Sequence, residues 1–124
     1  MKLSRTEEQV MQYLWKLKKA FVKDLLLEFP TPKPATTTVV TMLKRMREKG
    51  YIEYNQVGKK SREYYPIVKK TDYFSKHING LIKNFFNDSS IQFASFFTSE
   101  TDLTIEELED LKQVIDNQIK KNKK

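Results

Sequence analysis

The sequence has no cysteine, and this absence excludes several classes of protein at once. Without cysteine the chain can form no disulfide framework, thiolate metal site or cysteine nucleophile, which fits a reducing cytoplasm. The sequence also has no apolar run that approaches the length of a transmembrane helix. Met1 leads into charged residues rather than the apolar core of a signal peptide. We therefore expect a soluble cytoplasmic protein.

Glycine and histidine are too scarce for common catalytic and ligand-binding patterns. The three glycines, at positions 50, 58 and 80, cannot form a glycine-rich phosphate loop. His77 is the single histidine and has no companions at a spacing that suits a metal site. An acidic cluster at 106–110 lies on one predicted helix and is interpreted as a solvated face. No catalytic triad can be assembled, so we expect no enzyme, cofactor or small-molecule ligand.

The charge of the chain is unevenly distributed. Of 124 residues, 39% are hydrophobic and 12% aromatic, which is enough for a modest core, and the net charge is +7. Residues 1–70 contain 16 Lys and Arg against 7 Asp and Glu, whereas residues 71–124 contain 7 against 9. A basic first part and a slightly acidic second part suggest that residues 1–70 bind a polyanion. A membrane surface would also attract the basic part.

The first 70 residues follow the order of a winged helix-turn-helix domain. Ser4 and Glu7 form a capping-box pattern before the first apolar helix, and a proline cluster ends the second helix. The expected elements are helices after Ser4, over 22–29 and within 34–50, then strands over 51–54 and 64–68 around a hairpin tip at 56–63. Tyr54 and Tyr64 are expected to face each other across the hairpin. Three helices followed by a hairpin define the winged helix-turn-helix order.

The helix within 34–50 has two faces with different tasks. Val39, Leu43 and Met46 repeat at the spacing of a buried stripe. The opposite face carries threonines, which are unfavourable on an exposed helix because the branched carbon loses side-chain freedom. Small hydroxyls beside cations suit a helix that enters a DNA groove. We predict DNA contacts from the helix near 36–49 and the wing near 56–63, made by Thr37, Thr38, Thr41, Lys44, Arg45, Lys59, Lys60 and Arg62.

Plainer interpretations of these residues stay open. The third helix could be an ordinary surface helix with a solvated basic face, and the wing cations could be a solvated hairpin tip. Arg45 could offer a bidentate fork to guanine or hold a phosphate. We interpret Tyr13, Trp15 and Tyr51 as core and rim packing rather than as base-stacking platforms.

Residues 71–124 show helical periodicity and an excess of phenylalanine. The expected elements are a helix from Thr71 or Asp72 through Phe85, a short apolar helix over 91–97, a polar link over 98–102 and a last helix capped by Thr104. About fifty residues of this composition bury their own apolar surface poorly as a monomer. We therefore predict a helical dimerisation domain over 71–124, with interface residues Phe74, Ile78, Leu81, Phe85, Phe93, Phe96, Phe97, Leu108, Leu111 and Ile115. The fold class expected for the whole chain is mainly α with a small β-hairpin.

Four stretches, taken in order, carry a resemblance to a known family. Residues 38–50, TVVTMLKRMREKG, are similar to the pattern T-V-x-T-x-L-x-R-L-x-x-K-G. Residues 3–15, LSRTEEQVMQYLW, are similar to S-x-x-E-x-x-V-M-x-x-x-W. Residues 64–66, YYP, resemble a return strand after a wing, and residues 103–115, LTIEELEDLKQVI, resemble a last helix. Together these stretches resemble the penicillinase repressor family (BlaI, MecI and CopY) of transcriptional regulators.

The resemblance implies a homodimeric repressor. Each winged helix would bind half of a dyad-symmetric double-stranded DNA operator, and the C-terminal helices would exchange between subunits. By position, Thr38, Thr41 and Arg45 would face the major groove, and the wing cations would lie near phosphate or the minor groove. The family further implies cleavage triggered by a membrane sensor metalloprotease system, near Phe96 and Phe97, where Phe96 replaces the family's asparagine. The copper-responsive branch uses a paired cysteine site, which this chain lacks.

Two other classes of function stay open beside the repressor. The first is a winged-helix protein-interaction module without DNA binding, although such a module would not need Thr38, Thr41, Arg45 and a basic wing. The second is a membrane-surface protein, which would need an exposed apolar helix face. The apolar stripes of residues 1–70 are instead expected in a core.

Overall fold

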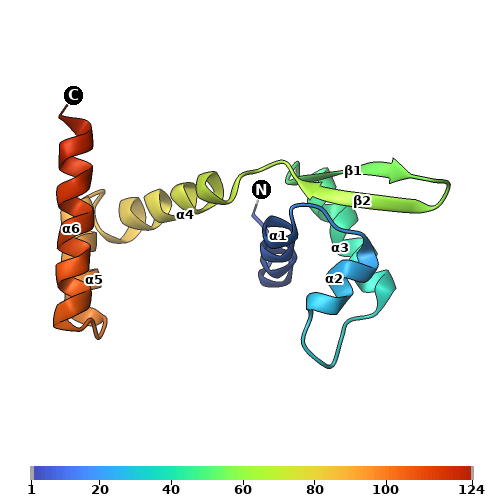
Figure 1. Ribbon diagram of the computed structural model, residues 1–124, viewed down its shortest axis with the longest axis horizontal. Coiled ribbons are helices and arrows are strands. Elements are labelled where there is room, and N and C mark those ends of the chain that lie inside the picture. The colour runs from blue at the N-terminus through green and yellow to red at the C-terminus, as the bar shows by residue number, and fades with distance from the viewer. Residues whose placement is uncertain (1, 124) are drawn as a thin grey trace. The chain divides into compact units, whose positions relative to one another are not determined.

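The computed structural model describes residues 2–123, and it is mainly helical with one two-stranded antiparallel sheet in that range. The elements are α1 (Arg5–Leu17), α2 (Val22–Glu28), α3 (Thr36–Glu48), β1 (Ile52–Val57), β2 (Ser61–Pro66), α4 (Lys70–Phe85), α5 (Ser90–Glu100) and α6 (Ile105–Asn122) (Figure 1). The predicted fold class is confirmed. The chain forms two compact units, Met1–Ser75 and Lys76–Lys124. Among residues 2–123, no helix has both the length and the apolar character that crossing a bilayer needs.

Local hydrogen bonds define the ends of α1 and α2. The Ser4 hydroxyl accepts the Glu7 amide at 3.2 Å, and the Glu7 carboxylate accepts the Ser4 amide at 2.7 Å, so the predicted capping box is confirmed. At the C-terminal end of α2, the Lys33 ammonium donates to the carbonyls of Leu26 at 2.8 Å and Phe29 at 2.6 Å. A cation placed there satisfies carbonyl groups that have no partner inside the helix.

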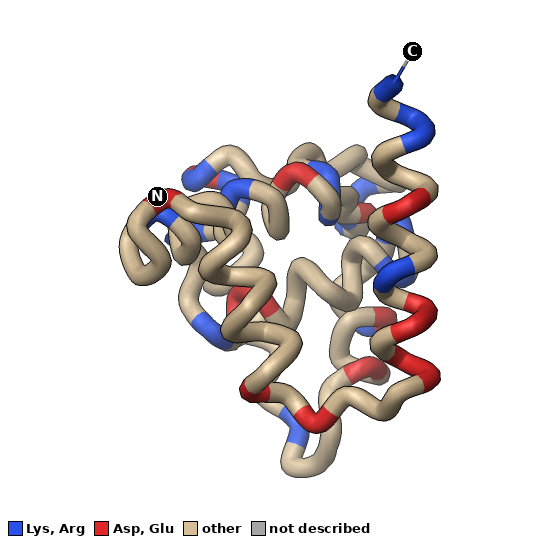
Figure 2. The backbone as a smooth tube through the Cα atoms, turned by 90° about the vertical axis from the view of Figure 1, so that its left-hand side faces the viewer, with Lys and Arg blue, Asp and Glu red and all other residues tan. Residues whose placement is uncertain are grey.

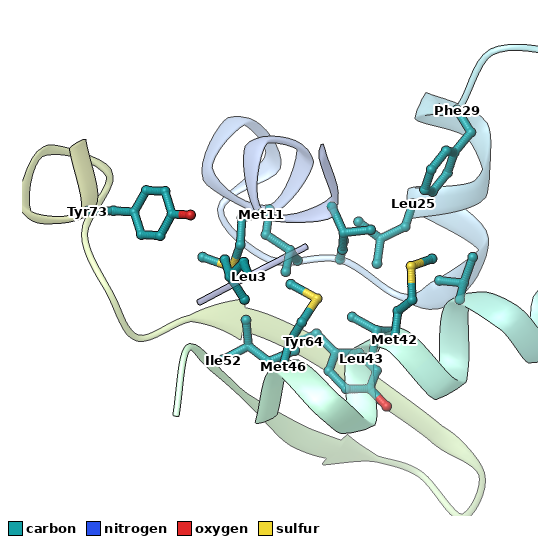
Figure 3. Packing of buried hydrophobic residues seen from close by; sticks show 14 residues of the cluster. Leu3, Met11, Leu25, Phe29, Met42, Leu43, Met46, Ile52, Tyr64 and Tyr73 are labelled. Carbon is teal, nitrogen blue, oxygen red and sulfur yellow. The ribbon is translucent and has the colours of Figure 1, made fainter. Parts of the chain in front are cut away.

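The core of the first unit lies between the three helices and the hairpin. Met42, Leu43 and Met46 point from α3 toward α1, α2 and the sheet (Figure 3). The buried cluster comprises Leu3, Val10, Met11, Leu14, Ala20, Leu25, Phe29, Val39, Met42, Leu43, Met46, Ile52, Tyr64 and Tyr73. The predicted buried stripe of the third helix is therefore confirmed, and so is the packing role of Tyr13, Trp15 and Tyr51 against this core. Burial of this apolar surface is the main source of stability for the unit.

The hairpin is longer than the sequence predicted. Cross-strand pairing continues from Ile52 opposite Pro66 to Val57 opposite Ser61, which leaves a tip of only three residues, 58–60. The predicted tip over 56–63 was therefore too long, because Gly58 adopts a positive φ of +67° that suits a tight turn, and Val57 and Ser61 on either side of that turn stay in the ladder. Tyr54 and Tyr64 face each other as predicted, with ring centroids 5.5 Å apart.

Ala20 adds a short third edge to this hairpin. Its amide donates to the Tyr64 carbonyl at 2.9 Å, and its carbonyl accepts the Tyr64 amide at 2.8 Å. The segment between the first two helices is thus extended at Ala20. This pair of hydrogen bonds ties the segment before α2 to the base of the wing.

The first turn of α4 packs on the first unit. The ring centroids of Tyr73 and Phe74 lie 5.6 and 6.0 Å from that of Trp15. The ring centroid of Tyr73 also lies 5.9 Å from that of Tyr51. Burial, and then a hydrogen bond to Glu8, raise the pKa of the Tyr73 hydroxyl. The helix begins at Lys70, so the predicted start at Thr71 or Asp72 was slightly late. The aromatic packing of Tyr73 favours this earlier turn, in which the Tyr73 amide donates to the Lys69 carbonyl at 3.0 Å.

The second unit contains the rest of α4 followed by α5 and α6. The helix α5 runs to Glu100, so the polar link predicted over 98–102 was wrong for its first three residues. Hydroxyls of Thr98 and Ser99 donate back to the carbonyls of Ala94 and Phe96 at 2.9 and 3.3 Å, which lets polar residues continue the helix. The Thr104 hydroxyl accepts the Glu107 amide at 3.1 Å, and the Glu107 carboxylate accepts the Thr104 amide at 3.0 Å. The predicted capping box is therefore confirmed.

The two ends of α6 carry opposite charges. Figure 2 shows acidic positions along the helix that leads to the C-terminus and basic positions at its end. Glu106 and Glu107 lie in its first turn and Lys120 and Lys121 in its last turn. This order complements the helix dipole at both ends.

A buried ion pair joins the start of α1 to the end of α3. The Lys49 ammonium lies 2.8 Å from the Glu7 carboxylate, and Glu7 is only 3% exposed. Burial raises the pKa of Glu7, but the hydrogen bonds from Lys49 and Ser4, with the charge of Lys49, together hold it below its usual value. The second carboxylate oxygen of Glu7 has no hydrogen-bond partner within residues 2–123. Removing one member of such a pair leaves an uncompensated buried charge.

Replacement of this lysine should destabilise the first unit. We expect Lys49→Met to lower its free energy of unfolding by about 1–3 kcal/mol, because the buried Glu7 carboxylate loses its cation. The fluorescence of Trp15, the single tryptophan, measured in a urea titration at pH 7, reports on this unit. Lys44→Met, on the exposed side of the same helix, is the matched control and should change stability by less than about 0.5 kcal/mol. Equal effects of the two variants would contradict the assignment.

The same variant should respond to pH with a defined sign. In the wild type the lowered pKa of Glu7 contributes stability above the unfolded pKa, near 4.5, and this contribution disappears as the pH falls through the lower folded pKa. In Lys49→Met the carboxylate is buried without a cation, so its protonation should become favourable in the folded state. The stability difference between the two proteins should therefore be smaller at pH 4 than at pH 7. A difference that grows on acidification would contradict this account.

Candidate nucleic-acid interface

The exposed side of α3 brings most of the predicted helix contacts together. Its buried side holds Val39, Met42, Leu43 and Met46, and this packing turns the threonines outward. A shallow depression of about 250 Å³ is lined by Thr37, Thr38, Thr41, Met42 and Arg45. Lys44 is also exposed but does not line this depression.

An internal hydrogen bond decides what Thr41 presents to a ligand. Its hydroxyl donates to the Thr37 carbonyl one turn earlier, at 2.9 Å. Such a bond inside the helix uses the hydroxyl hydrogen, so that the oxygen lone pairs and the methyl group remain for an outside partner. In a DNA major groove these groups match the amino groups of adenine and cytosine and the methyl group of thymine.

A second and larger depression lies between α2, α3 and the wing. Its volume is about 630 Å³, and it is lined by Phe21, Val22, Lys23, Val40, Gln56, Lys59, Lys60, Ser61 and Arg62. The three predicted wing cations therefore line one concave surface together. Lys59 and Lys60 occupy the turn, while Arg62 lies on β2 rather than in the tip.

The charges on these two depressions are not compensated by acidic neighbours. Ion pairs within residues 2–123 join Lys16 to Glu28, Lys19 to Glu63, Arg47 to Glu53 and Lys49 to Glu7. In that part of the chain, none of them includes Arg45 or the cations of the larger depression. Exposed cations that gather without acidic partners are the electrostatic footprint of a polyanion-binding surface.

Sequence reasoning missed Lys23 as a member of this surface. Lys23 lies in the first turn of α2, with its ammonium 6.0 Å from the centre of the Phe21 ring, and it faces the wing across the larger depression. The hairpin brings Lys59 and Lys60 to the same depression although they are more than thirty residues away in the chain. The only sequence signal was the positive charge itself, because helical periodicity says nothing about a partner so distant.

A group of side chains at the base of the wing was also missed. Arg47, in the last turn of α3, pairs with Glu53 of β1, and this hydrogen bond raises the pKa of Arg47 and lowers that of Glu53. The guanidinium groups of Arg47 and Arg62 both lie over the Tyr54 ring, at 4.7 and 4.5 Å from its centre. These contacts connect the end of α3 to both strands of the hairpin.

Most of the predicted dimerisation residues are exposed to solvent in the single chain. Phe85 is 77% exposed, Phe96 52% and Ile115 53%. The ring centroid of Phe86 lies 5.5 Å from that of Phe93 and 5.4 Å from that of Phe96, so these three phenylalanines form one contiguous group. Within residues 2–123, no group of three or more His, Cys, Asp or Glu side chains is arranged to hold a metal ion.

Comparisons with known proteins relate the chain to a family of repressors. The family model described as "Penicillinase repressor" matches residues 3–117. The methicillin resistance regulatory protein MecI of Staphylococcus epidermidis is 25% identical over 114 residues, covering 91% of this chain and 92% of the relative. The penicillinase repressor of Bacillus licheniformis is 25% identical over 123 residues, covering 98% and 94%. With the match of the family model over nearly its whole length, the chain belongs to the penicillinase repressor family of transcriptional repressors.

Proposed function

We propose that the chain is a homodimeric repressor that binds a dyad-symmetric operator in double-stranded DNA. The observation that carries this proposal is the pair of uncompensated cationic depressions on the two sides of the exposed face of α3. Thr37, Thr38 and Thr41 give the helix a small profile, which a helix in the major groove requires. Arg45 supplies the donor groups that a guanine edge or a phosphate accepts.

The wing complements this helix on the DNA backbone. Lys59, Lys60 and Arg62 line the same concave surface as Lys23, and a DNA strand presents a convex row of phosphates. In this arrangement α3 reads base edges, and the larger depression holds the neighbouring backbone. Contacts to phosphate fix the register of the helix, and contacts to bases carry the sequence preference.

The second unit supports the homodimer. In residues 76–123, Ile82 is the one large apolar side chain that is buried, at 8% exposure. The following large apolar side chains of this unit are exposed: Ile78, Leu81, Phe85, Ile91, Phe96, Phe97, Ile105, Leu108, Val114, Ile115 and Ile119. Apolar surface of this extent on a small helical unit indicates an interface with another chain. A second copy is the partner that a symmetric operator demands, because two half-sites require two α3 helices.

The printed names of the relatives support repression as the regulatory outcome. One relative is named a methicillin resistance regulatory protein and the other a penicillinase repressor. A dimer of this chain that covers an operator would repress transcription by occupying the DNA.

Release from DNA by cleavage near Phe96 and Phe97 is the further step of this proposal. Both residues lie inside α5 and are accessible at 52% and 39%. A bond inside a helix has to leave the helical ladder before an extended protease cleft can accept it, so cleavage by a membrane sensor metalloprotease system would require local unfolding of α5.

Arg45 should determine operator affinity. A duplex selected from a random-sequence library by the wild-type protein at low salt serves as the probe in a mobility-shift assay. We expect Arg45→Ala to weaken binding by about 1–3 kcal/mol and to relax selectivity at one base pair if Arg45 reads guanine. If it holds phosphate, the loss should be uniform across sequences and the salt slope should fall by about one.

Lys112→Ala, on the exposed side of α6, is the matched control for loss of positive charge and should bind like the wild type. A folded wild-type dimer that shifts no duplex at low salt would overturn the repressor proposal. It would favour the protein-interaction module instead.

The dimer should depend on the apolar surface of the second unit. We expect the wild type to sediment as a dimer at micromolar concentration and Ile115→Glu to sediment as a monomer. Ile115 is 53% exposed in one chain, so the introduced carboxylate stays in contact with water in the monomer, and the helix content should be retained. Operator affinity should fall by about 10²-fold or more when the two half-sites are no longer bound together.

Leu27→Glu is the matched control, since Leu27 is 74% exposed on α2 of the first unit. This variant should sediment as the wild type does. A wild-type protein that remains monomeric at micromolar concentration would exclude the homodimer.

A further inference from the structure

Tyr54 lies where the core of the first unit ends and the larger depression begins. It is half-buried on β1, directly opposite the buried Tyr64. Side chains alternate between the two faces of a strand, so Ile52, Tyr54 and Gln56 share one face. Ile52 belongs to the core, and Gln56 lines the larger depression. Tyr54 is therefore the residue between these two environments.

Arg62 reaches the Tyr54 ring from the neighbouring strand. In the hairpin register Arg62 pairs with Gln56 and is two residues from Tyr64, which makes it a diagonal neighbour of Tyr54 on the same face. Its guanidinium carbon is 4.5 Å from the ring centre, within the range of a cation–π interaction. Arg62 also lines the larger depression, so the contact fixes a cation at the rim of the surface assigned to DNA.

The two arginines on this ring are in different electrostatic situations. Glu53 pairs with Arg47 and compensates its charge. Within the part of the chain that the structure describes, no carboxylate pairs with Arg62. The Arg47–Glu53 pair thus ties the ring and its strand to the end of α3, while Arg62 keeps an uncompensated charge for an outside anion.

We propose that Tyr54 is a positioning residue for DNA binding, whose ring holds Arg62 over the larger depression so that its guanidinium meets a backbone phosphate in an ordered state. This inference rests on the proposed function and adds a residue to it. A free arginine loses side-chain freedom when it binds a phosphate, and a ring that orders it beforehand reduces that loss. The hydroxyl of Tyr54 has no part in the proposal, since the face of the ring makes the contact.

The test is a double-mutant cycle on operator affinity with the selected duplex as the probe. Tyr54→Leu should weaken binding about three- to tenfold, and Tyr54→Phe, which keeps the ring, should bind within about twofold of the wild type. Arg62→Gln should weaken binding and reduce the salt slope by about one. In the Arg62→Gln background, Tyr54→Leu should have little further effect, because its influence passes through Arg62.

Two controls separate positioning from a loss of fold. Tyr65→Leu removes a half-buried tyrosine from the other face of the same hairpin and should leave the salt slope unchanged. In the free protein, the ring current of Tyr54 should move the side-chain proton resonances of Arg62 upfield. That shift should persist in Tyr54→Phe and disappear in Tyr54→Leu. Urea titrations followed by Trp15 fluorescence identify conditions in which every variant is folded.

Three outcomes would overturn the inference. The first is Tyr54→Leu binding as the wild type does, and the second is an equal loss with Arg62 present or replaced. The third is an Arg62 spectrum that does not change when the ring is removed. A wild-type protein that binds no duplex would instead overturn the proposed function, and this inference with it.

Discussion

The packing of one side of α3 determines what its other side presents. Val39, Leu43 and Met46 are fully buried, so the helix cannot rotate about its axis without exposing apolar surface to water. With the rotation fixed, Thr38, Thr41 and Arg45 have to face outward, and the small polar surface of the helix is a direct consequence of its core contacts. A hydrophobic constraint thereby sets the geometry of a polar interface.

Contacts at the C-terminal end of α3 extend this constraint to the rest of the first unit. The end of the helix is tied to α1 by the Lys49–Glu7 pair and to the hairpin by the Arg47–Glu53 pair. The segment before α2 is joined to the hairpin through the paired hydrogen bonds of Ala20 and Tyr64. The wing and the start of α2 therefore keep a fixed spacing from α3. A concave protein surface needs such a fixed spacing to match a rigid DNA backbone, because the phosphates cannot move to follow a mobile protein surface.

The parts of the structure that could be predicted from sequence are those set by local chemistry. Helical period gave the buried side of α3, and the Ser4 and Thr104 capping boxes gave the starts of α1 and α6. Hairpin length could not be predicted, since it depends on cross-strand pairing that continues to Val57 and Ser61. The grouping of Lys23 with the wing cations, and of Arg47 and Arg62 on the Tyr54 ring, was missed for a related reason. These contacts join separate elements of the fold, and no periodicity of one segment encodes them.

The two units differ in how far they bury their own apolar residues. The first unit closes its core with its own residues and leaves cations outside, whereas the second leaves its apolar residues open. A monomer would thus hold one α3 against one half-site and keep an apolar surface in water. Joining two second units would remove that surface and place two α3 helices on one DNA molecule. The free energy of apolar burial would then be converted into operator selectivity, because a wrong half-site would weaken an assembly that the second unit holds together.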